Sequence, residues 1–397
     1  MKLLIYSYFF APSIGGVENV VMSLARGLAE ASSQDGTPEF EITLVTETPA
    51  GDFDDGLLSF RVVRQPKFQT LWHLFRGADL VHLCGPALLP LFLAWLLGKP
   101  AVIEHHGYQA ICLNGLLLHR PGNTACPGHF QAGHYMECLR CEKHESSGLR
   151  SLIRLLLMFP RLLLSRKAAR NLAITNHVLE RHALPRSSVI YYGIEDPLPK
   201  GPDSARATPA SERVCFAYVG RLVPEKGIPV LLEAARTLRE KGERFQVRLI
   251  GDGPERARLE ATIARNGLES CVFLTGALSG AALGDALREV SVVVMPSVWE
   301  ETAGLAAIEQ MMRGKLVIAS DIGGLGEIVR DAGLKCTPGI AAELATRMGQ
   351  VLQNTSLVDS LGGRARERAL HLFARGRMIE EHARVYHEVL RKRMSEA

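Results

Sequence analysis

The chain has 397 residues, which is more than one hydrophobic core usually serves, so its length predicts two or three domains. Apolar residues make up 47% and charged residues 22%, as in a globular protein. The formal net charge of +4 is too small for binding nucleic acid by charge alone, and we expect no nucleic-acid partner.

No stretch indicates a targeting or membrane-spanning segment. Residues 1–13 carry one lysine and an apolar run but no small-residue cleavage site. The apolar run 88–97 is too short to cross a bilayer and is typical of a buried helix. We therefore expect a cytoplasmic protein.

Short apolar runs alternate with helical spacing through the first half of the chain. Residues 18–32 have the spacing of a helix, and runs typical of buried strands occupy 2–9, 40–48, 60–65, 78–84 and 100–107. Alternating strands and helices predict right-handed βαβ units in a mostly parallel sheet.

The alternation stops at residues 193–212, a stretch rich in Pro, Gly, Ser and charge that predicts a linker. It then resumes with Val- and Ile-rich strands, which are typical of parallel strands buried on both faces. We expect strands at 213–222, 245–253, 271–276, 292–296 and 315–324, and helices at 228–242, from 254, near 279–289 and from about 304.

These patterns predict an α/β protein with two doubly wound, Rossmann-like domains and a ligand cleft between them. The first domain spans 1–192, the linker 193–212 and the second domain 213–375. Residues 376–397 form a C-terminal helix that is a candidate to pack back on the first domain.

The loop after the first strand of the second domain carries two cations. Arg221 and Lys226 are flanked by glycines, and a pair of cations at a strand end suits a diphosphate. A solvated turn is the alternative for such a short motif. In the first domain, Gly15 and Gly16 lie between a strand and a helix, which is a phosphate-binding arrangement although not a complete G-x-G-x-x-G.

A second polar loop follows the strand at 292–296. Thr302 is the expected N-cap of a helix that begins near Gly304, whose free N–H groups would face an anion. Glu309 lies in the second turn and has the chemistry to accept two hydrogen bonds from a vicinal diol such as ribose. Glu301 precedes the helix and would reach a second hydroxylated ring, whereas its neighbour Glu300 is expected to be solvated.

Several motifs in order along the chain resemble glycosyltransferase family 4, the group that includes glycogen synthase and mannosyltransferases. They are YFFAPSIGGVENVVMSLARGL, YYGIE, YVGRLVPEKG, LIGDGPERARLE, PSVWEETAGLAAIEQM and ASDIGGLGEIV. The resemblance implies a retaining transferase with the GT-B fold that uses a nucleotide-sugar donor. Departures include Tyr192, where the family usually has Asn, and Lys315 and Leu316 in place of a small residue and Pro.

The resemblance also implies roles for individual residues. The family has two glutamates with seven residues between them, which only Glu301 and Glu309 match: Glu309 would bind ribose, and Glu301 the donor sugar. Arg221 and Lys226 match the cations that hold the diphosphate. The backbone N–H groups of Ala303, Gly304 and Leu305 would lie near the sugar and phosphates, Gly16 would close on the phosphates, and His106 would lie close to the donor sugar.

Catalysis in this family needs no metal cofactor, because the cations and the helix N-terminus stabilise the leaving diphosphate. The implied donor is a UDP- or GDP-sugar. The implied acceptor is a glycan or a lipid-linked molecule in envelope or exopolysaccharide synthesis. Two other hypotheses stay open: a GT-B nucleotide-sugar epimerase, and a non-catalytic nucleotide-binding scaffold.

The insert 107–145 contains Cys112, Cys126, Cys138 and Cys141 in segments that read as loops. The Cys138-x2-Cys141 pair is typical of half a zinc site, and the other two cysteines would complete a structural site. Free thiols or a disulfide are the alternatives.

The segment 149–170 is apolar and basic, with no acid between 150 and 170. Arg150, Arg154 and Arg161 are predicted to share one helix face, which is typical of a helix lying in an anionic membrane interface. We expect peripheral binding at the inner membrane face, and a core helix with solvated arginines is the alternative.

Overall fold

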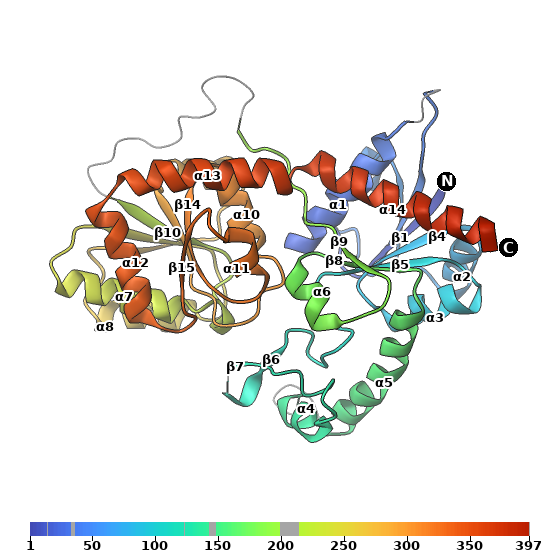
Figure 1. The fold of residues 1–397 in the computed structure, drawn as a ribbon, viewed down its shortest axis with the longest axis horizontal. Coiled ribbons are helices and arrows are strands. Elements are labelled where there is room, and N and C mark those ends of the chain that lie inside the picture. Colours follow the sequence, from blue (N-terminus) through green and yellow to red (C-terminus); the bar gives the residue numbers. More distant parts are fainter. Residues whose placement is uncertain (14, 33–35, 123, 143–147, 199–213, 397) are drawn as a thin grey trace. The chain divides into compact units, whose positions relative to one another are not determined.

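The computed structural model describes residues 1–13, 15–32, 36–122, 124–142, 148–198 and 214–396. The chain divides into two compact units, residues 1–122, 126–194 and 373–397 in the first, and 123–125 and 195–372 in the second. Each unit contains a parallel sheet flanked by helices (Figure 1). Most of the predicted linker, 199–212, lies outside the described residues.

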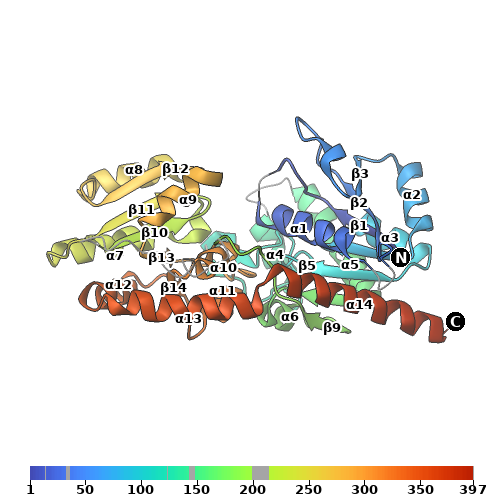
Figure 2. The ribbon, with the colours of Figure 1, turned by 90° about the horizontal axis from the view of Figure 1, so that it is seen from above.

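The first unit is built on a seven-stranded parallel sheet with the strand order β3-β2-β1-β4-β5-β8-β9 (Figure 2). Strands β1, β4 and β5 are buried along nearly their whole length, as the apolar runs predict. The strands are β1 (Lys2–Ser7), β2 (Glu41–Thr46), β3 (Arg61–Arg64), β4 (Leu80–Cys84), β5 (Ala101–His105), β8 (Arg170–Ala173) and β9 (Ser187–Val189).

The helices of the first unit include the end of the chain, because α14 packs on α1. The helices are α1 (Gly16–Glu30), α2 (Phe68–Gly77), α3 (Leu88–Leu96), α4 (Tyr135–Glu142), α5 (Gly148–Lys167), α6 (Asn176–His182) and α14 (Arg375–Glu396). The short strands β6 (Leu118–His119) and β7 (Thr124–Ala125) lie in the insert.

The second unit contains a six-stranded parallel sheet with the order β12-β11-β10-β13-β14-β15 (Figure 2). Its strands are β10 (Cys215–Val219), β11 (Gln246–Ile250), β12 (Val272–Gly276), β13 (Val292–Met295), β14 (Leu316–Ser320) and β15 (Leu334–Cys336). Its helices are α7 (Ile228–Glu240), α8 (Arg256–Arg265), α9 (Gly280–Arg288), α10 (Leu305–Met312), α11 (Gly323–Val329), α12 (Ala341–Gln353) and α13 (Ser356–Leu372).

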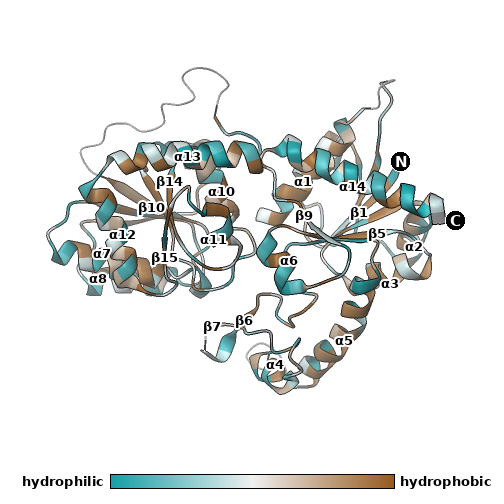
Figure 3. Cartoon of the chain, in the orientation of Figure 1, coloured by the Kyte–Doolittle hydropathy of each residue, from teal (hydrophilic) through white to brown (hydrophobic). Residues whose placement is uncertain are grey.

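The prediction of a buried helix at 88–97 is wrong for one of its faces. Leu91 and Leu93 of α3 are buried, but Phe92, Trp95 and Leu96 are exposed. Helix α3 is hydrophobic, as Figure 3 shows, and its packing against the sheet and α5 leaves some of its apolar residues exposed. Among the described residues, no helix combines the length and the apolar character needed to cross a membrane.

Candidate functional site

The strand order of the second unit reverses between β10 and β13, which pair directly. Ligands of doubly wound sheets bind outside the carboxyl ends of the strands at such a reversal. The loop after β10 carries Arg221 and Lys226, and the loop after β13 carries Glu301. A hydrogen bond from the N–H of Val298 to the carbonyl of Glu225, at 3.0 Å, joins the two loops.

Glu301 and Lys226 form an ion pair in this region. The Lys226 Nζ lies 3.0 Å from Oε1 of Glu301, and the Ser297 hydroxyl donates to the same oxygen. The Glu301 side chain is only 4% exposed, so its charge depends on these partners. Lys226 also lies 5.8 Å from the ring centroid of Trp299. Sequence reasoning missed Ser297 and Trp299. The contact of Trp299 with Lys226 depends on the pairing of the two loops, whereas Ser297 reaches Glu301 within its own loop.

A glycine allows the two loops to approach closely. Gly227 has φ of +68°, and a Cβ there would lie 1.9 Å from the carbonyl oxygen of Pro296.

Upstream, the Tyr218 hydroxyl donates to the carbonyl of Arg221 at 2.7 Å. Burial, followed by the charge of Glu301, raises the pKa of Tyr218 and keeps this hydroxyl protonated. The Arg221 side chain itself is exposed.

Helix α10 begins next to Glu301, but the prediction of Thr302 as its N-cap is wrong. The N-cap is Gly304, which has φ of +77°, a conformation that favours glycine over threonine. No side chain caps this end, so N–H groups of the first turn lack an intrahelical acceptor. Ala303 and Leu305 flank Gly304, and the three predicted backbone donors therefore lie at one helix end.

The remaining carboxylates of this region have different surroundings. Glu309 lies in the second turn of α10 and is half-buried, and burial raises its pKa. Glu300 is half-buried rather than fully solvated.

In the first unit, His106 directly follows β5 and its ring is held on both sides. Its Nδ1 lies 2.7 Å from the Tyr192 hydroxyl, and its Nε2 lies 3.6 Å from the carboxylate of Glu104. Burial is the main cause that raises the pKa of Tyr192, so its hydroxyl stays protonated. Both ring nitrogens therefore face protein groups, and the predicted role of His106 beside a donor sugar stays a prediction.

Glu104 lies at the centre of a buried cluster that sequence reasoning missed. His82 and His382 also approach its carboxylate, at 3.4 and 3.6 Å. Burial alone raises the pKa of Glu104, but His106 and His382 outweigh it and hold the value well below its usual range. Glu104 raises the pKa of His382 against the effect of burial, while burial lowers the pKa of His82 and His106. These directions favour a protonated His382 beside an ionised Glu104.

The glycines at the start of α1 have an acidic neighbour. Gly15 is the N-cap and Gly16 the first residue of α1, as the strand–glycine–helix pattern predicts. A Cβ at Gly15 would lie 2.2 Å from Oε2 of Glu18, so this carboxylate folds over the N-cap. An acid in the first turn is stabilised by the helix dipole, and a bound phosphate would compete with it.

All four cysteines of the insert line one small cavity of ≈ 20 Å³, together with His119 and His129. All eight cysteines of the chain are free thiols, so the disulfide alternative finds no support. Cys138 and Cys141 lie on the helix α4, not in a loop as predicted, and their three-residue spacing places them on one face. No group of three metal-ligand side chains in the described part of the chain is arranged to hold an ion as it stands.

Contrary to the loop-like reading of the insert, a small apolar core joins it to α5. Phe130 and Cys138 pack with Leu155 and Met158 of α5. The three arginines predicted to share one face of α5 have different environments. Arg154 pairs with the buried Glu142, and Arg161 is half-buried with a bond to the carbonyl of Gln109 at 3.4 Å. Arg150 is exposed.

Hydrophobic residues predominate along much of α5, as its brown colour in Figure 3 shows, and several of them are exposed. Leu156 and Leu163 are 57% and 56% exposed. The alternative of an ordinary core helix is therefore contradicted along this face.

Comparisons with known proteins agree with the architecture. Residues 202–368, less than half of the chain, match the family model described as Glycosyl transferases group 1. Anabaena HepE, solved in complex with UDP, superposes with a TM-score of 0.71 at 18% identity, covering 98% of this chain and 100% of HepE. Sucrose-phosphate synthase from Thermosynechococcus elongatus also gives 0.71, at 21% identity and 98% and 99% coverage. The chain has the GT-B fold.

Two sequence relatives each match less than half of this GT-B chain. The 2-deoxystreptamine glucosyltransferase of Streptomyces kanamyceticus is 35% identical over 172 residues, which are 40% of this chain and 44% of the relative. The MMP alpha-(1->4)-mannosyltransferase of Mycolicibacterium hassiacum is 28% identical over 200 residues, 49% and 48% of the two chains. The chain thus spans less than half the length of these relatives.

Proposed function

We propose that this GT-B chain is a retaining glycosyltransferase that moves a hexose-type sugar from a nucleotide-diphosphate sugar to a glycan or lipid-linked acceptor, in envelope or exopolysaccharide synthesis. The observation that carries the proposal is the pairing of Lys226 with the buried Glu301 at the strand reversal of the second unit. Exposed Arg221 and the uncapped start of α10 complete a set of groups suited to a sugar diphosphate. The match to the transferase family model covers this region.

The chemistry of the proposed transfer follows from the charges. As the bond between the anomeric carbon and the diphosphate breaks, negative charge gathers on the leaving diphosphate. Arg221, Lys226 and the N–H groups at the start of α10 would stabilise that charge electrostatically. Glu301 would contact the sugar ring, and Glu309 the ribose. We assign no side chain as a nucleophile, and the proposed mechanism uses no metal ion.

The identity of the donor is a separate proposal. We propose a UDP- or GDP-sugar, supported by the solved complexes of HepE with UDP and with UDP-glucose, which show a shared fold at 18% identity. The curated relatives named as a glucosyltransferase and a mannosyltransferase support a hexose.

We also propose a structural zinc ion held by Cys112, Cys126, Cys138 and Cys141. The shared cavity supports it, and a set of four thiolates is a donor set that zinc prefers. Zinc bound there would join the Cys112 loop to α4 and order the insert. The exposed leucines of α5 support peripheral association of this helix with the cytoplasmic face of a membrane.

A transfer assay tests the proposal. The purified chain is incubated with radiolabelled UDP-glucose or GDP-mannose and a lipid-linked glycan acceptor, and the anomeric configuration of the product is read by NMR. We expect transfer with retention of configuration, and we expect Arg221→Ala to reduce it strongly. Inversion would refute the retaining mechanism. Formation of an epimerised donor without acceptor would favour the epimerase. Absence of both products would favour the non-catalytic scaffold.

A further inference from the structure

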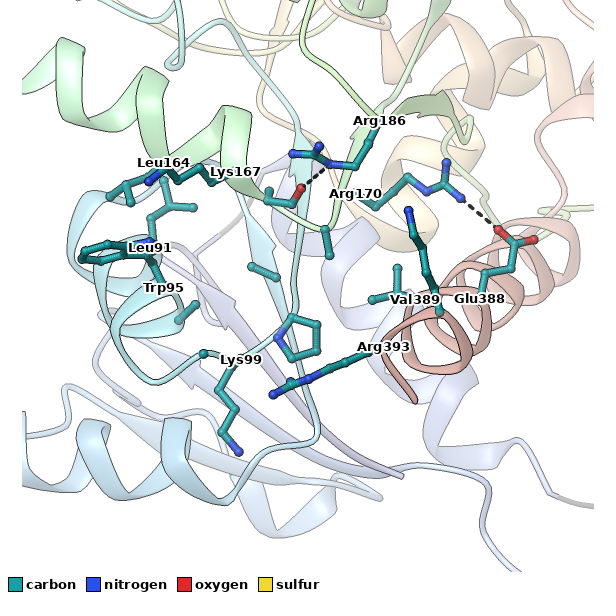
Figure 4. Close-up of a pocket in the computed structure, with 17 residues that line it drawn as sticks. Leu91, Trp95, Lys99, Leu164, Lys167, Arg170, Arg186, Glu388, Val389 and Arg393 are labelled. Atoms are coloured by element: carbon teal, nitrogen blue, oxygen red, sulfur yellow. Dashed lines mark hydrogen bonds and ion pairs between the residues drawn. The ribbon is translucent and has the colours of Figure 1, made fainter. Parts of the chain in front are cut away.

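A basic pocket lies in the first unit at the edge of the sheet opposite to His106. It has a volume of ≈ 730 Å³ and is lined by α3, the end of α5, the starts of β5 and β8, and α14 (Figure 4). Ala101, which lines it, begins β5, whereas His106 follows the end of this strand. A strand of five residues extends roughly 15 Å, so within this unit the pocket is separate from His106 and its partners.

The lining of the pocket is strongly positive. Six cations contribute to it, namely Lys99, Lys167, Arg170, Arg186, Lys392 and Arg393, against one acid, Glu388. That acid pairs with Arg170 at 2.9 Å, as the dashed line in Figure 4 shows. Clustered cations repel one another, and an anionic occupant would relieve that repulsion.

Several of these cations are held in place by the surrounding backbone or by a ring. The Nε of Arg186 donates to the carbonyl of Ala168 at 2.9 Å, and Lys99 donates to that of Ala78 at 2.7 Å. Lys167 lies 5.3 Å from the ring centroid of Trp95. Arginine forks and lysine ammonium groups together are suited to a phosphate.

The other wall of the pocket is apolar and continues to the surface. Leu91, Leu164 and Val389 line it, and so does Trp95, which is 51% exposed. Phe92 of α3, next to Trp95 in the helix, is also exposed. Tryptophan beside basic side chains and exposed apolar residues is typical of a surface that meets the membrane interface. A small soluble anion would have no use for this apolar rim.

We propose that this pocket binds the phosphate of an anionic phospholipid headgroup while the exposed apolar residues of α3 and α5 enter the membrane interface. The proposal deepens the membrane association of α5 stated above, because it adds a headgroup site and a second helix. It depends on none of the residues assigned to sugar transfer.

Vesicle co-sedimentation tests the proposal on the full chain. Vesicles of phosphatidylcholine alone are compared with vesicles that also contain phosphatidylglycerol. The test variant is Lys167→Glu with Arg393→Glu. The control is Arg244→Glu with Arg265→Glu, two exposed arginines of the second unit, which changes the net charge equally. We expect the pocket variant to lose about tenfold or more in binding to anionic vesicles, and the control to lose much less.

Equal losses in the two double variants would overturn the headgroup site, because only the overall charge would then matter. The wild type could instead be stabilised by glycerol phosphate, with this effect lost in the pocket variant, and fail to bind anionic vesicles. That result would assign the pocket to a soluble phosphate compound and overturn the proposal. The proposal would also be overturned if the wild type bound an oligonucleotide and not vesicles, and the pocket variant lost that binding. An unchanged circular dichroism spectrum verifies that the pocket variant is folded. An unchanged UDP-induced thermal shift shows that its nucleotide site is intact, so failure of the headgroup proposal is distinguished from failure of the transferase proposal.

Discussion

Glu300 and Glu301 are adjacent in the sequence but differ in their surroundings. The spacing of seven residues before Glu309 selects Glu301 from the sequence alone, through the family resemblance. The Ser297 hydroxyl donates to Glu301 from within the same loop, four residues away. That spacing does not reveal the contact with Lys226, which lies on the loop after β10. Parallel pairing of β10 with β13 creates the contact.

We predict that Glu301→Ala reduces sugar transfer by about 10²-fold or more, because it removes the buried carboxylate that we propose contacts the donor sugar. Glu300→Ala is the matched control and should stay within a few-fold of the wild type. Initial rates of transfer, together with UDP-binding affinity, measure both. Equal losses in the two variants would contradict the assignment of Glu301.

Glu104 is the second residue whose importance only the fold reveals. The folded pKa of Glu104 lies below its usual value of 4.5, so its contribution to stability is present above that pH and is lost as the pH falls through the folded pKa. The folded pKa of His382 lies above 6.5, so its contribution is present below pH 6.5 and is lost as the pH rises through the folded value. Their pairing is strongest between these limits.

We therefore predict that Glu104→Gln lowers the unfolding free energy of the first unit by about 3 kcal/mol or more near pH 6, because a buried imidazolium loses its partner. The difference from the wild type should narrow as the pH rises through the folded pKa of His382, because the imidazole is then neutral in both proteins. Urea titrations near pH 6 and above the folded pKa of His382, followed by the fluorescence of Trp72 and Trp95 in the first unit, measure it. A difference independent of pH would show that Glu104 and His382 do not form an ion pair.

At the scale of elements, apolar periodicity locates strands and helices well but does not say what covers them. The strands at 2–9 and 100–107 are confirmed as β1 and β5 because burial on both faces leaves a continuous apolar run. Helix α3 is equally apolar, yet Trp95 and Phe92 are exposed. Composition alone does not separate a face that packs on protein from one that is left for another partner.

For α5 we predict that Leu156→Gln with Leu163→Gln weakens binding to vesicles about tenfold without loss of stability, because both side chains are exposed in the fold. Reversal of Arg154 would be a poorer test, since it would leave the buried Glu142 unpaired. Leu57→Gln with Leu370→Gln is the matched control, being exposed elsewhere. Equal co-sedimentation of both double variants would remove α5 from the membrane surface.

For α4 we predict about one zinc ion per chain by metal analysis, and its loss in Cys138→Ser with Cys141→Ser. Removal of zinc by a chelator should lower the melting temperature of the first unit, because bound metal contributes to folding. Cys271→Ser, at a buried thiol of the second unit, should keep the metal. If protein purified after growth with added zinc contains no zinc, the zinc site is contradicted and the four cysteines are free thiols.

At the scale of the whole molecule, two parallel sheets with reversed strand order define a GT-B protein, and nucleotide binding is expected mainly from residues 195–372. We predict that UDP or GDP at 100 times its dissociation constant stabilises this unit by about 2.7 kcal/mol. Calorimetry should show the shift in one of two unfolding transitions, and Arg221→Ala should reduce it. A shift confined to the first unit would contradict the assigned donor site.

Apolar patterns in the sequence predict the fold class and most of the strands, although they miss β8, β9 and β15. A family resemblance adds the candidate residues of the second unit. These follow from local periodicity and short motifs, in which the relevant residues are close in the chain. Tertiary structure alone decided which partners those residues have: Lys226 for Glu301, three histidines for Glu104, and six cations for one pocket. The reason is that parallel pairing and helix packing join segments far apart in the chain, and local periodicity carries no record of such contacts.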